Sequence, residues 1–222
     1  MRGHEARASR ADCKARATWV LTLHCQQSSR YNHGVASRRS GEQLGGETLC
    51  DHRSIVSIAS NGASRLVLRP LTEGDEAELL RIHSTPAVVR WWDVPDEGFP
   101  WSDEPEATRL TIVLDKAVAG MIQFCEETSP KYRHATIDLF LDPALHGLGL
   151  GTEAVKRVVR HLIDDRGHHR ITIDPSTGNT AAIRSYEKAG FRAVGVMRHY
   201  ERPLGAEQWR DGLLMELLAE ED

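Results

Sequence analysis

The segment LDPALHGLGLG, at residues 141–151, is the feature that most constrains how this chain can fold. It follows an apolar, strand-like run and leads into a stretch with one apolar face at helical spacing. Glycines at alternate positions let main-chain N–H groups approach a ligand closely, and a helix that begins there favours negative charge at its N-terminus. The segment therefore predicts a phosphate-binding turn between a strand and a helix. A turn that only redirects the chain is the alternative at this point.

The spacing of these glycines excludes two common nucleotide-binding classes. No Lys-Ser or Lys-Thr pair follows them, as a P-loop requires, and the spacing is not Gly-x-Gly-x-x-Gly. Neither a nucleotide hydrolase nor a dinucleotide oxidoreductase is indicated.

The periodicity around the turn predicts the fold class. Residues 65–70 alternate like a strand, and Thr72 is placed to cap a helix that continues through Leu79 and Ile82. Further helices are expected at residues 149–165 and 179–189, and further strands at residues 111–114, 118–125, 135–141, 169–173, 191–197 and 209–218. This order is not a series of repeated crossover units, so we expect an α/β fold with a mixed sheet.

The charge distribution divides the chain into two parts. Residues 1–64 carry nine Lys and Arg against five Asp and Glu, a net charge of +4, and because the whole chain is −4 the rest carries −8. The first part is rich in Arg, Ser and Gly and offers few apolar side chains to offset the entropy of ordering. We expect a disordered basic extension over residues 1–63 and one folded domain over residues 64–222.

Composition also limits the partners. No apolar run approaches the ~18 residues that a membrane span needs, so a cytoplasmic protein without a membrane partner is expected. The four cysteines show neither a disulfide framework nor metal-ligand spacing, so no metal is expected. An acidic domain disfavours nucleic acid and suits a cationic small molecule. Monomer and homodimer are both open.

A second motif, DPSTGNTAAIRSYEKAGF, occupies residues 174–191 and predicts a strand end, a loop, a helix and a glycine-terminated exit. The two motifs together resemble the acetyl-CoA-binding motifs of the GNAT superfamily of acetyltransferases, whose glycine loop has the form Gln/Arg-x-x-Gly-x-Gly/Ala. His146 stands at the Gln/Arg position here. The resemblance implies the GNAT fold, a mostly antiparallel sheet splayed between its fourth and fifth strands with flanking helices. It also implies acetyl-CoA as the acetyl donor.

The resemblance further implies which residues bind the cofactor. Phe140 and Leu141 pair with the pantetheine arm, and Asn179 contacts the cofactor, with a plain helix N-cap as the alternative. Tyr186 protonates the departing thiolate, with a half-buried core aromatic as the alternative. The glycine turn holds the pyrophosphate, and its predicted residues are His146, Gly147, Leu148, Gly149, Leu150, Gly151 and Thr152.

The candidates for the acceptor side are mainly acids. A carboxylate in a strand interior, such as Asp138, is costly unless it is paired or used. Asp174 ends the next strand, at the edge where ligands of open α/β sheets bind. The alternatives are a solvent-facing position for Asp138 and a turn-starting role for Asp174. Trp91 and Trp92 are further candidates on an expected loop, and a core position at a helix end is their alternative. Asp93 and Glu126 are the remaining candidates. For Glu126 the alternative is a solvated surface position without a role in binding.

The combination of RPLT at 69–72, VRWW at 89–92, ID at 137–138 and the second motif resembles one GNAT branch, the aminoglycoside 6′-N-acetyltransferases. This resemblance implies that Asp138 engages the 6′-amino group as the base, Asp174 binds another ring amine, and Trp91 or Trp92 packs against the sugar. Aminoglycosides are polycations, which suits a domain of charge −8. Acetylation removes a charge-assisted contact with RNA phosphates and so confers antibiotic resistance.

Other readings stay open at the level of sequence. We expect direct transfer rather than an acyl-enzyme, with Cys125 as a buried strand cysteine. The alternatives are a GNAT enzyme that acts on a protein N-terminus, a lysine or a siderophore-type amine, and a non-catalytic acyl-CoA sensor.

Overall fold

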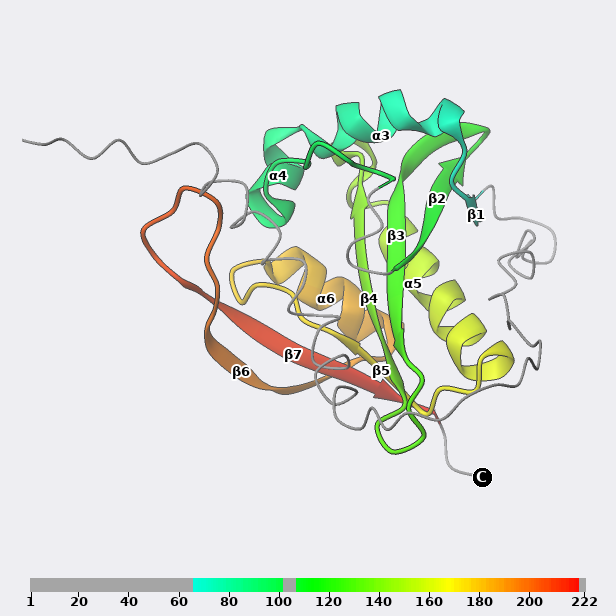
Figure 1. Ribbon diagram of the computed structural model, residues 1–222, viewed down its shortest axis with the longest axis vertical. Coiled ribbons are helices and arrows are strands. Elements are labelled where there is room, and N and C mark those ends of the chain that lie inside the picture. Colours follow the sequence, from blue (N-terminus) through cyan, green and yellow to red (C-terminus); the bar gives the residue numbers. More distant parts are fainter. Residues whose placement is uncertain (1–65, 102–106, 220–222) are drawn as a thin grey trace, which may run out of the picture.

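The computed structural model describes residues 66–101 and 107–219, so the extension expected over residues 1–63 lies outside the described part of the chain. A seven-stranded sheet runs through the molecule in the order β1-β2-β3-β4-β5-β7-β6 (Figure 1). Every neighbouring pair is antiparallel except β4 and β5, which are parallel. The mixed sheet expected from the sequence is confirmed. Its strands are β1 (Leu66–Pro70), β2 (Thr108–Leu114), β3 (Ala117–Glu127), β4 (His134–Leu141), β5 (Arg170–Ile173), β6 (Arg192–Glu201) and β7 (Arg210–Leu218).

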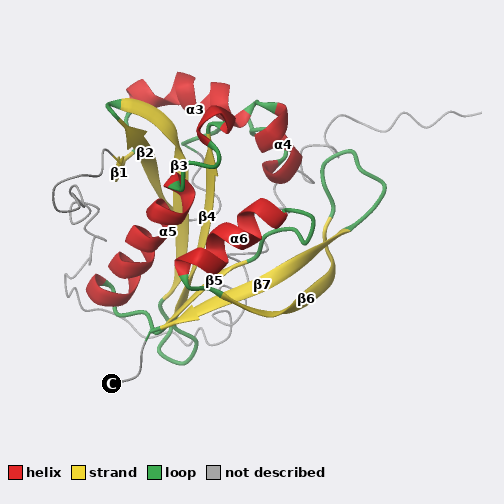
Figure 2. Ribbon diagram, turned by 180° about the vertical axis from the view of Figure 1, so that it is seen from behind, coloured by secondary structure: helices red, strands yellow, loops and turns green. Residues whose placement is uncertain are grey.

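Helices cover both faces of the sheet. The long helices α5 and α6 lie against one face, which is turned to the viewer in Figure 2, and the short helices α3 and α4 lie over the other face near one end. Within the described ranges, no helix is long and apolar enough to cross a membrane. The α-helices are α3 (Glu76–His83), α4 (Pro86–Trp92), α5 (Leu150–Arg160) and α6 (Thr180–Ala189).

Strand alternation divides the core between these two layers. Ile137 of β4 is buried with the apolar side of α5 and α6. Phe140, three residues further along β4, is buried with Met121 beneath α3 and α4. Successive side chains of a strand point to opposite faces, so the even-numbered residues of β4 face the α3 and α4 side. Asp138 therefore lies on that side.

Two helical segments differ from their expected form. The helical stretch after Thr72 is broken into a 3-10 turn η3 (Glu73–Asp75), helix α3, and helix α4, which begins at Pro86 because proline is favoured at a first helical position. Trp91 and Trp92, expected on a loop, are the last two residues of α4. The helix expected over residues 149–165 ends as α5 at Arg160 and continues as a π-helical turn, η5 (His161–Asp165).

A buried carboxylate joins the first helical segment to the sheet. Asp75 accepts two hydrogen bonds of 2.6 Å from Arg69 of β1, one of 2.9 Å from the Thr111 hydroxyl of β2, and one of 2.9 Å from the Thr72 N–H. The Arg69 guanidinium holds the pKa of Asp75 well below its usual range. Both oxygens of the Asp75 carboxylate have hydrogen-bond donors, which offsets the cost of burying its charge.

Candidate active site

Strands β4 and β5 separate after a short parallel pairing. They pair at only two positions, the second being Thr136 with Thr172, whose hydroxyl oxygens lie 2.9 Å apart. Beyond this point β5 ends at Ile173, while β4 continues to Leu141. Figure 1 shows β4 diverging from β5 and β7 on the way to α3 and α4. The second half of β4 therefore has a backbone edge that β5 does not cover.

Two carbonyl groups near this end of β4 contact side chains from outside the sheet. The Trp92 indole Nε1–H donates to the Leu139 carbonyl oxygen over 3.1 Å. The His146 Nε2 atom lies 3.2 Å from the Leu141 carbonyl oxygen. Because a carbonyl oxygen can accept two hydrogen bonds, each of these groups keeps one acceptor position beyond the contact named here.

The glycine turn leads from β4 into α5. Gly147 and Gly149 have φ angles of 80° and 78°, in the left-handed region that other residues adopt only at a cost. A Cβ atom at either position would meet nothing within 4 Å, so backbone conformation alone requires the glycines. Leu148 between them is exposed. Gly149 is the N-cap of α5, and the N–H groups of residues 150–152 lie in a first turn, where a helix supplies no acceptor of its own.

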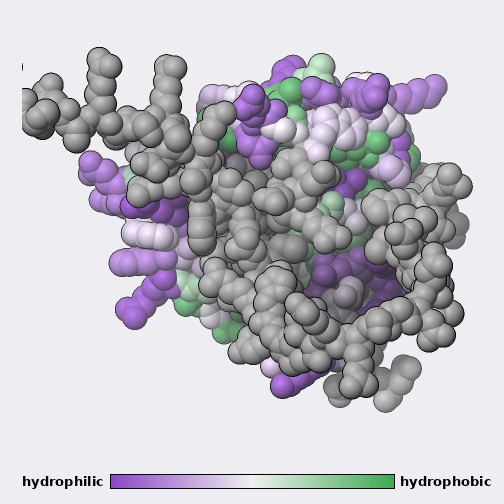
Figure 3. All heavy atoms as spheres, in the orientation of Figure 1, coloured by the Kyte–Doolittle hydropathy of each residue, from purple (hydrophilic) through white to green (hydrophobic). Residues whose placement is uncertain are grey.

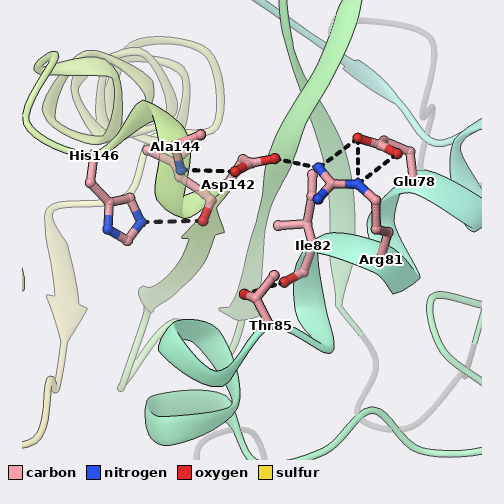
Figure 4. A network of polar contacts seen from close by, with 8 residues as sticks. Glu78, Arg81, Ile82, Thr85, Asp142, Ala144 and His146 are labelled. Carbon is pink, nitrogen blue, oxygen red and sulfur yellow. Dashed lines mark hydrogen bonds and ion pairs between the residues drawn. The ribbon is translucent and has the colours of Figure 1, made fainter.

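A network of charged groups fixes the start of this turn. Asp142 accepts a hydrogen bond of 2.9 Å from the Ala144 N–H, and its other oxygen pairs with Arg81 of α3. The Arg81 guanidinium also holds Glu78 at 2.7 Å (Figure 4). Burial pushes the pKa of Asp142 upward, but the Ala144 N–H and Arg81 outweigh it and lower that pKa overall. Helix α3 is thereby tied to the segment that precedes the glycines.

The end of the turn packs against α6. The Thr152 hydroxyl lies 2.7 Å from the Ser185 hydroxyl, and a Cβ atom on Gly151 would already stand 3.4 Å from the Leu141 side chain. The first turn of α5 is therefore held between the end of β4 and the side of α6.

Two carboxylates follow the divergence of the strands. Beyond the pairing of Thr136 with Thr172, Asp138 lies two residues further along β4 and Asp174 comes directly after the end of β5. Asp138 is half-buried on β4, opposite Gln123 of β3. Asp174 follows the last residue of β5 and accepts a hydrogen bond of 2.5 Å from the Tyr200 hydroxyl.

The phenol of Tyr186 is close enough to feel both carboxylates. Tyr186 lies on α6 with 8% of its surface exposed. Burial, followed by the negative charges of Asp138 and Asp174, raises the pKa of Tyr186. The ring also packs against Phe191. Tyr186 is therefore a core aromatic residue, which was the alternative, and its hydroxyl also lies near the two acids. Near neutral pH the phenol keeps its proton and can donate it.

Both tryptophans have partners inside the protein. Trp92 packs edge-on against His83 and Phe140, with ring centroids 5.8 Å and 5.2 Å away. Burial lowers the pKa of His83 to about 4, so this imidazole is neutral at physiological pH. Trp91 is flanked by the guanidinium groups of Arg90 and Arg210, at 4.7 Å and 5.9 Å from its ring centroid. Packing of either ring against a sugar stays a prediction.

Two of the candidate acids hold other parts of the chain. Asp93 accepts a hydrogen bond of 3.4 Å from the Leu204 N–H in the loop between β6 and β7. Glu126 lies near the end of β3 that pairs with the start of β4, and it binds Arg166 and His168 at 2.8 Å each. Burial raises the pKa of Glu126, but His168 and Arg166 outweigh it and hold that pKa at about 2. The structure does not bring Glu126 to Asp138 and Asp174.

Two further residues from the sequence prediction have clear positions. The Asn179 side-chain oxygen accepts a hydrogen bond of 3.2 Å from the Ala182 N–H, so this residue is the N-cap of α6. Its contact with a cofactor stays a prediction. Cys125, expected to be a buried strand cysteine, lies on β3 with its side chain only half-buried.

Tyr200 is a site residue that the sequence did not reveal. The strand expected at residues 191–197 stops short of it, whereas β6 extends to Glu201. Nothing in the local sequence indicates a contact between Tyr200 and an acid that lies 26 residues earlier in the chain. No group of three or more His, Cys, Asp or Glu in the described ranges is arranged to hold a metal ion.

A family model described as an acetyltransferase (GNAT) domain matches residues 65–192, from β1 to the start of β6. The chain belongs to the GNAT family of acetyltransferases. It is thus an acetyl-CoA-dependent N-acetyltransferase, and the divergence of β4 and β5, with the glycine turn beside it, is part of the matched domain.

Relatives of this GNAT domain include proteins named for aminoglycosides. An aminoglycoside N(6′)-acetyltransferase type 1 from Klebsiella pneumoniae is 30% identical over 170 residues, which is 66% of this chain and 84% of the relative. A kanamycin resistance protein from Rhizobium radiobacter is 43% identical over 79 residues, 35% of this chain and 71% of the relative. The crystal structure of the acetyltransferase AAC(6′)-Ib with coenzyme A and kanamycin aligns with a TM-score of 0.57 at 26% identity, covering 69% of this chain and 94% of that chain.

The residues present fit coenzyme A at this site. The left-handed glycines and the first turn of α5 offer main-chain N–H groups and the positive end of a helix dipole to a pyrophosphate. The uncovered edge of β4 offers backbone partners to an extended pantetheine arm. Both features lead to the place where the negative charges of Asp138 and Asp174 act on the Tyr186 phenol.

Proposed function

We propose that this GNAT enzyme acetylates the 6′-amino group of aminoglycoside antibiotics and so confers resistance to them. The observation that carries the proposal is the pair of carboxylates, Asp138 and Asp174, at the place where β4 and β5 separate, whose charges both act on the Tyr186 phenol. Aminoglycosides carry several ammonium groups, and a site for them needs more than one carboxylate. The relatives named for aminoglycosides support the same substrate class.

Each polar group at the divergence has a distinct part in the proposed reaction. Bound acetyl-CoA supplies an acetyl group that is activated as a thioester. The Asp138 carboxylate accepts the proton that the 6′-ammonium must lose before its nitrogen can act as a nucleophile. Tyr186 Oη, which is protonated at neutral pH as any phenol is, donates its proton to the leaving sulfur. Asp174 holds a second ammonium of the acceptor and so orients the reacting amine.

The test compares two acceptors that differ at one atom. Neomycin carries an amino group at the 6′ position, and paromomycin carries a hydroxyl there on an otherwise identical skeleton. We expect thiol release from acetyl-CoA with neomycin and none above background with paromomycin. Equal release with both, or release only with a lysine peptide, would contradict the proposal.

Variants assign the proton acceptor in the same assay. Loss of a general base typically costs about 10²–10⁴-fold in rate, so Asp138→Asn should lower kcat for neomycin by at least about 100-fold. Asp164→Asn is the matched control, because it removes the same charge from an exposed position on η5. An Asp138→Asn enzyme as active as Asp164→Asn would remove Asp138 from the mechanism.

A further inference from the structure

An irregularity in β6 aims one tyrosine at the acceptor site. Residues 198–200 of β6 stand opposite a single residue of β7, Asp211, where the pairing register shifts. Within this bulge His199 has a φ angle of 52°, which is uncommon for a residue other than glycine. Its N–H donates a hydrogen bond of 2.8 Å to the Asp211 carboxylate. Bulges of this kind redirect a side chain, and strained backbone persists where the surroundings hold it.

A glycine on β7 makes room for the redirected ring. A Cβ atom on Gly212 would stand 2.7 Å from Tyr200 Cδ1 and 3.0 Å from the Met197 methyl group. Any larger residue at this position would push the phenol ring away from the sheet. Gly212 is itself buried, so the Tyr200 ring lies directly over the β7 backbone.

The same part of β7 holds the loop that carries Asp174. The Thr177 N–H donates to the Asp211 carbonyl over 2.9 Å, and the Leu213 N–H donates to the Pro175 carbonyl over 2.8 Å. Asp174 and Tyr200 are thus positioned against one piece of backbone. Figure 3 shows several hydrophilic residues on the side of the molecule where β6 joins β7.

The contact between the two side chains is short and has a defined direction. The Tyr200 hydroxyl lies 2.5 Å from Asp174 Oδ2. Burial, followed by the negative charge of Asp174, raises the pKa of Tyr200, and Asp138 adds to the effect. The phenol therefore keeps its proton and donates a hydrogen bond to the carboxylate. A carboxylate has about four acceptor positions, and the bond from Tyr200 occupies one of them.

We infer that Tyr200 determines acceptor specificity by fixing the Asp174 carboxylate, and that the two oxygens together bind a second ammonium group of a polyamine acceptor. This inference rests on the proposed function for the identity of the acceptor and adds a residue and a subsite to it. An ammonium at this subsite donates to Asp174 and to the phenolic oxygen. Tyr200 acts through binding and orientation, not through proton transfer at the reacting amine.

The experiment measures neomycin binding by calorimetry, in the presence of coenzyme A, for the full chain and its variants. Tyr200→Phe keeps the ring over Gly212 and removes only the hydroxyl. A hydrogen bond to a charged group is worth about 1.5–3 kcal/mol, so Tyr200→Phe should weaken binding about 10-fold or more. KM for neomycin should rise by the same factor while kcat changes less than about 2-fold. Tyr132→Phe is the matched control, because Tyr132 is an exposed tyrosine between β3 and β4.

A double-mutant cycle shows whether Tyr200 acts through Asp174. In an Asp174→Asn background, Tyr200→Phe should weaken binding by a clearly smaller factor than it does in the unmodified chain, with thermal unfolding confirming that each variant is folded. Independent, multiplicative effects, or unchanged binding by Tyr200→Phe, would overturn the inference. Spermidine, a linear polyamine, is measured in parallel. If spermidine is acetylated and neomycin is not, the proposed function fails, and a 10-fold effect of Tyr200→Phe on spermidine binding still supports the subsite. Binding of neither amine would overturn both.

Discussion

Replacing Gly149 by alanine isolates the role of the glycine turn, because the structure predicts a backbone effect without a steric one. Gly149 has a φ angle of 78°, and a Cβ atom there would meet nothing within 4 Å. An alanine in the left-handed region costs about 1–2 kcal/mol. For a domain of this size each kcal/mol lowers Tm by about 2–4 °C. If the chain relaxes out of this conformation instead, the N–H groups at the start of α5 turn away from the pyrophosphate.

Two measurements on Gly149→Ala separate these effects. Losing one hydrogen bond to a charged group costs about 1.5–3 kcal/mol, so the Kd for coenzyme A from calorimetry should rise about 10-fold or more. Thermal unfolding should show a lower Tm for the cofactor-free protein. Gly74→Ala is the control, because Gly74 lies in η3 and the nearest atom to its Cβ would be the Thr72 hydroxyl at 3.9 Å. A Gly149→Ala protein that kept the Tm of Gly74→Ala and still bound coenzyme A as tightly would refute the assignment of the pyrophosphate to this turn.

Two further changes test the placement of residues around the site. Glu126→Gln should destabilise the fold by about 3 kcal/mol, because it breaks the pair with Arg166 and His168, while KM for neomycin stays unchanged. Folding lowers the pKa of Glu126 from 4.5 to about 2, so its contribution to the free energy of unfolding is complete above pH 4.5 and is lost as the pH falls toward 2. Urea unfolding over this range should therefore show the difference in stability between the two proteins disappear. A raised KM would return Glu126 to the acceptor site. Gly120→Ala would place a Cβ atom 2.2 Å from the Phe140 carbonyl oxygen, so we expect a loss of about 1–3 kcal/mol by thermal unfolding and a raised KM for acetyl-CoA. An unchanged KM would show that the end of β4 is not part of the cofactor site.

Local patterns predicted most of the fold because each depends on a few neighbouring residues. The strands expected at residues 111–114 and 118–125 leave room only for a short turn, and the structure shows Asp115 and Lys116 there, both with positive φ, as a two-residue hairpin requires. The exit of α6 was placed from Gly190, which has a φ angle of 109°. The divergence of β4 from β5 has no such local pattern, and it followed only from the family resemblance.

The positions that were not predicted depend on long-range register. Glu126 lies at an end of β3 that an antiparallel pairing sets away from the glycine turn, and the sequence does not reveal that direction. For Trp91 and Trp92 the sequence favoured a loop over a core position at a helix end, although Thr85 and Pro86 are the N-cap position and the first residue of α4, which ends at Trp92. Tyr200 depends on a bulge at His199, where a non-glycine residue adopts a left-handed conformation through tertiary contacts.

A crystal structure of the complex with coenzyme A and neomycin tests the central claim most directly. We expect the pyrophosphate to accept hydrogen bonds from the main-chain N–H groups of residues 148–152, and the 6′-amino group to lie within hydrogen-bonding distance of Asp138. A pyrophosphate held elsewhere, or a neomycin whose 6′ position is turned away from Asp138, would contradict the account.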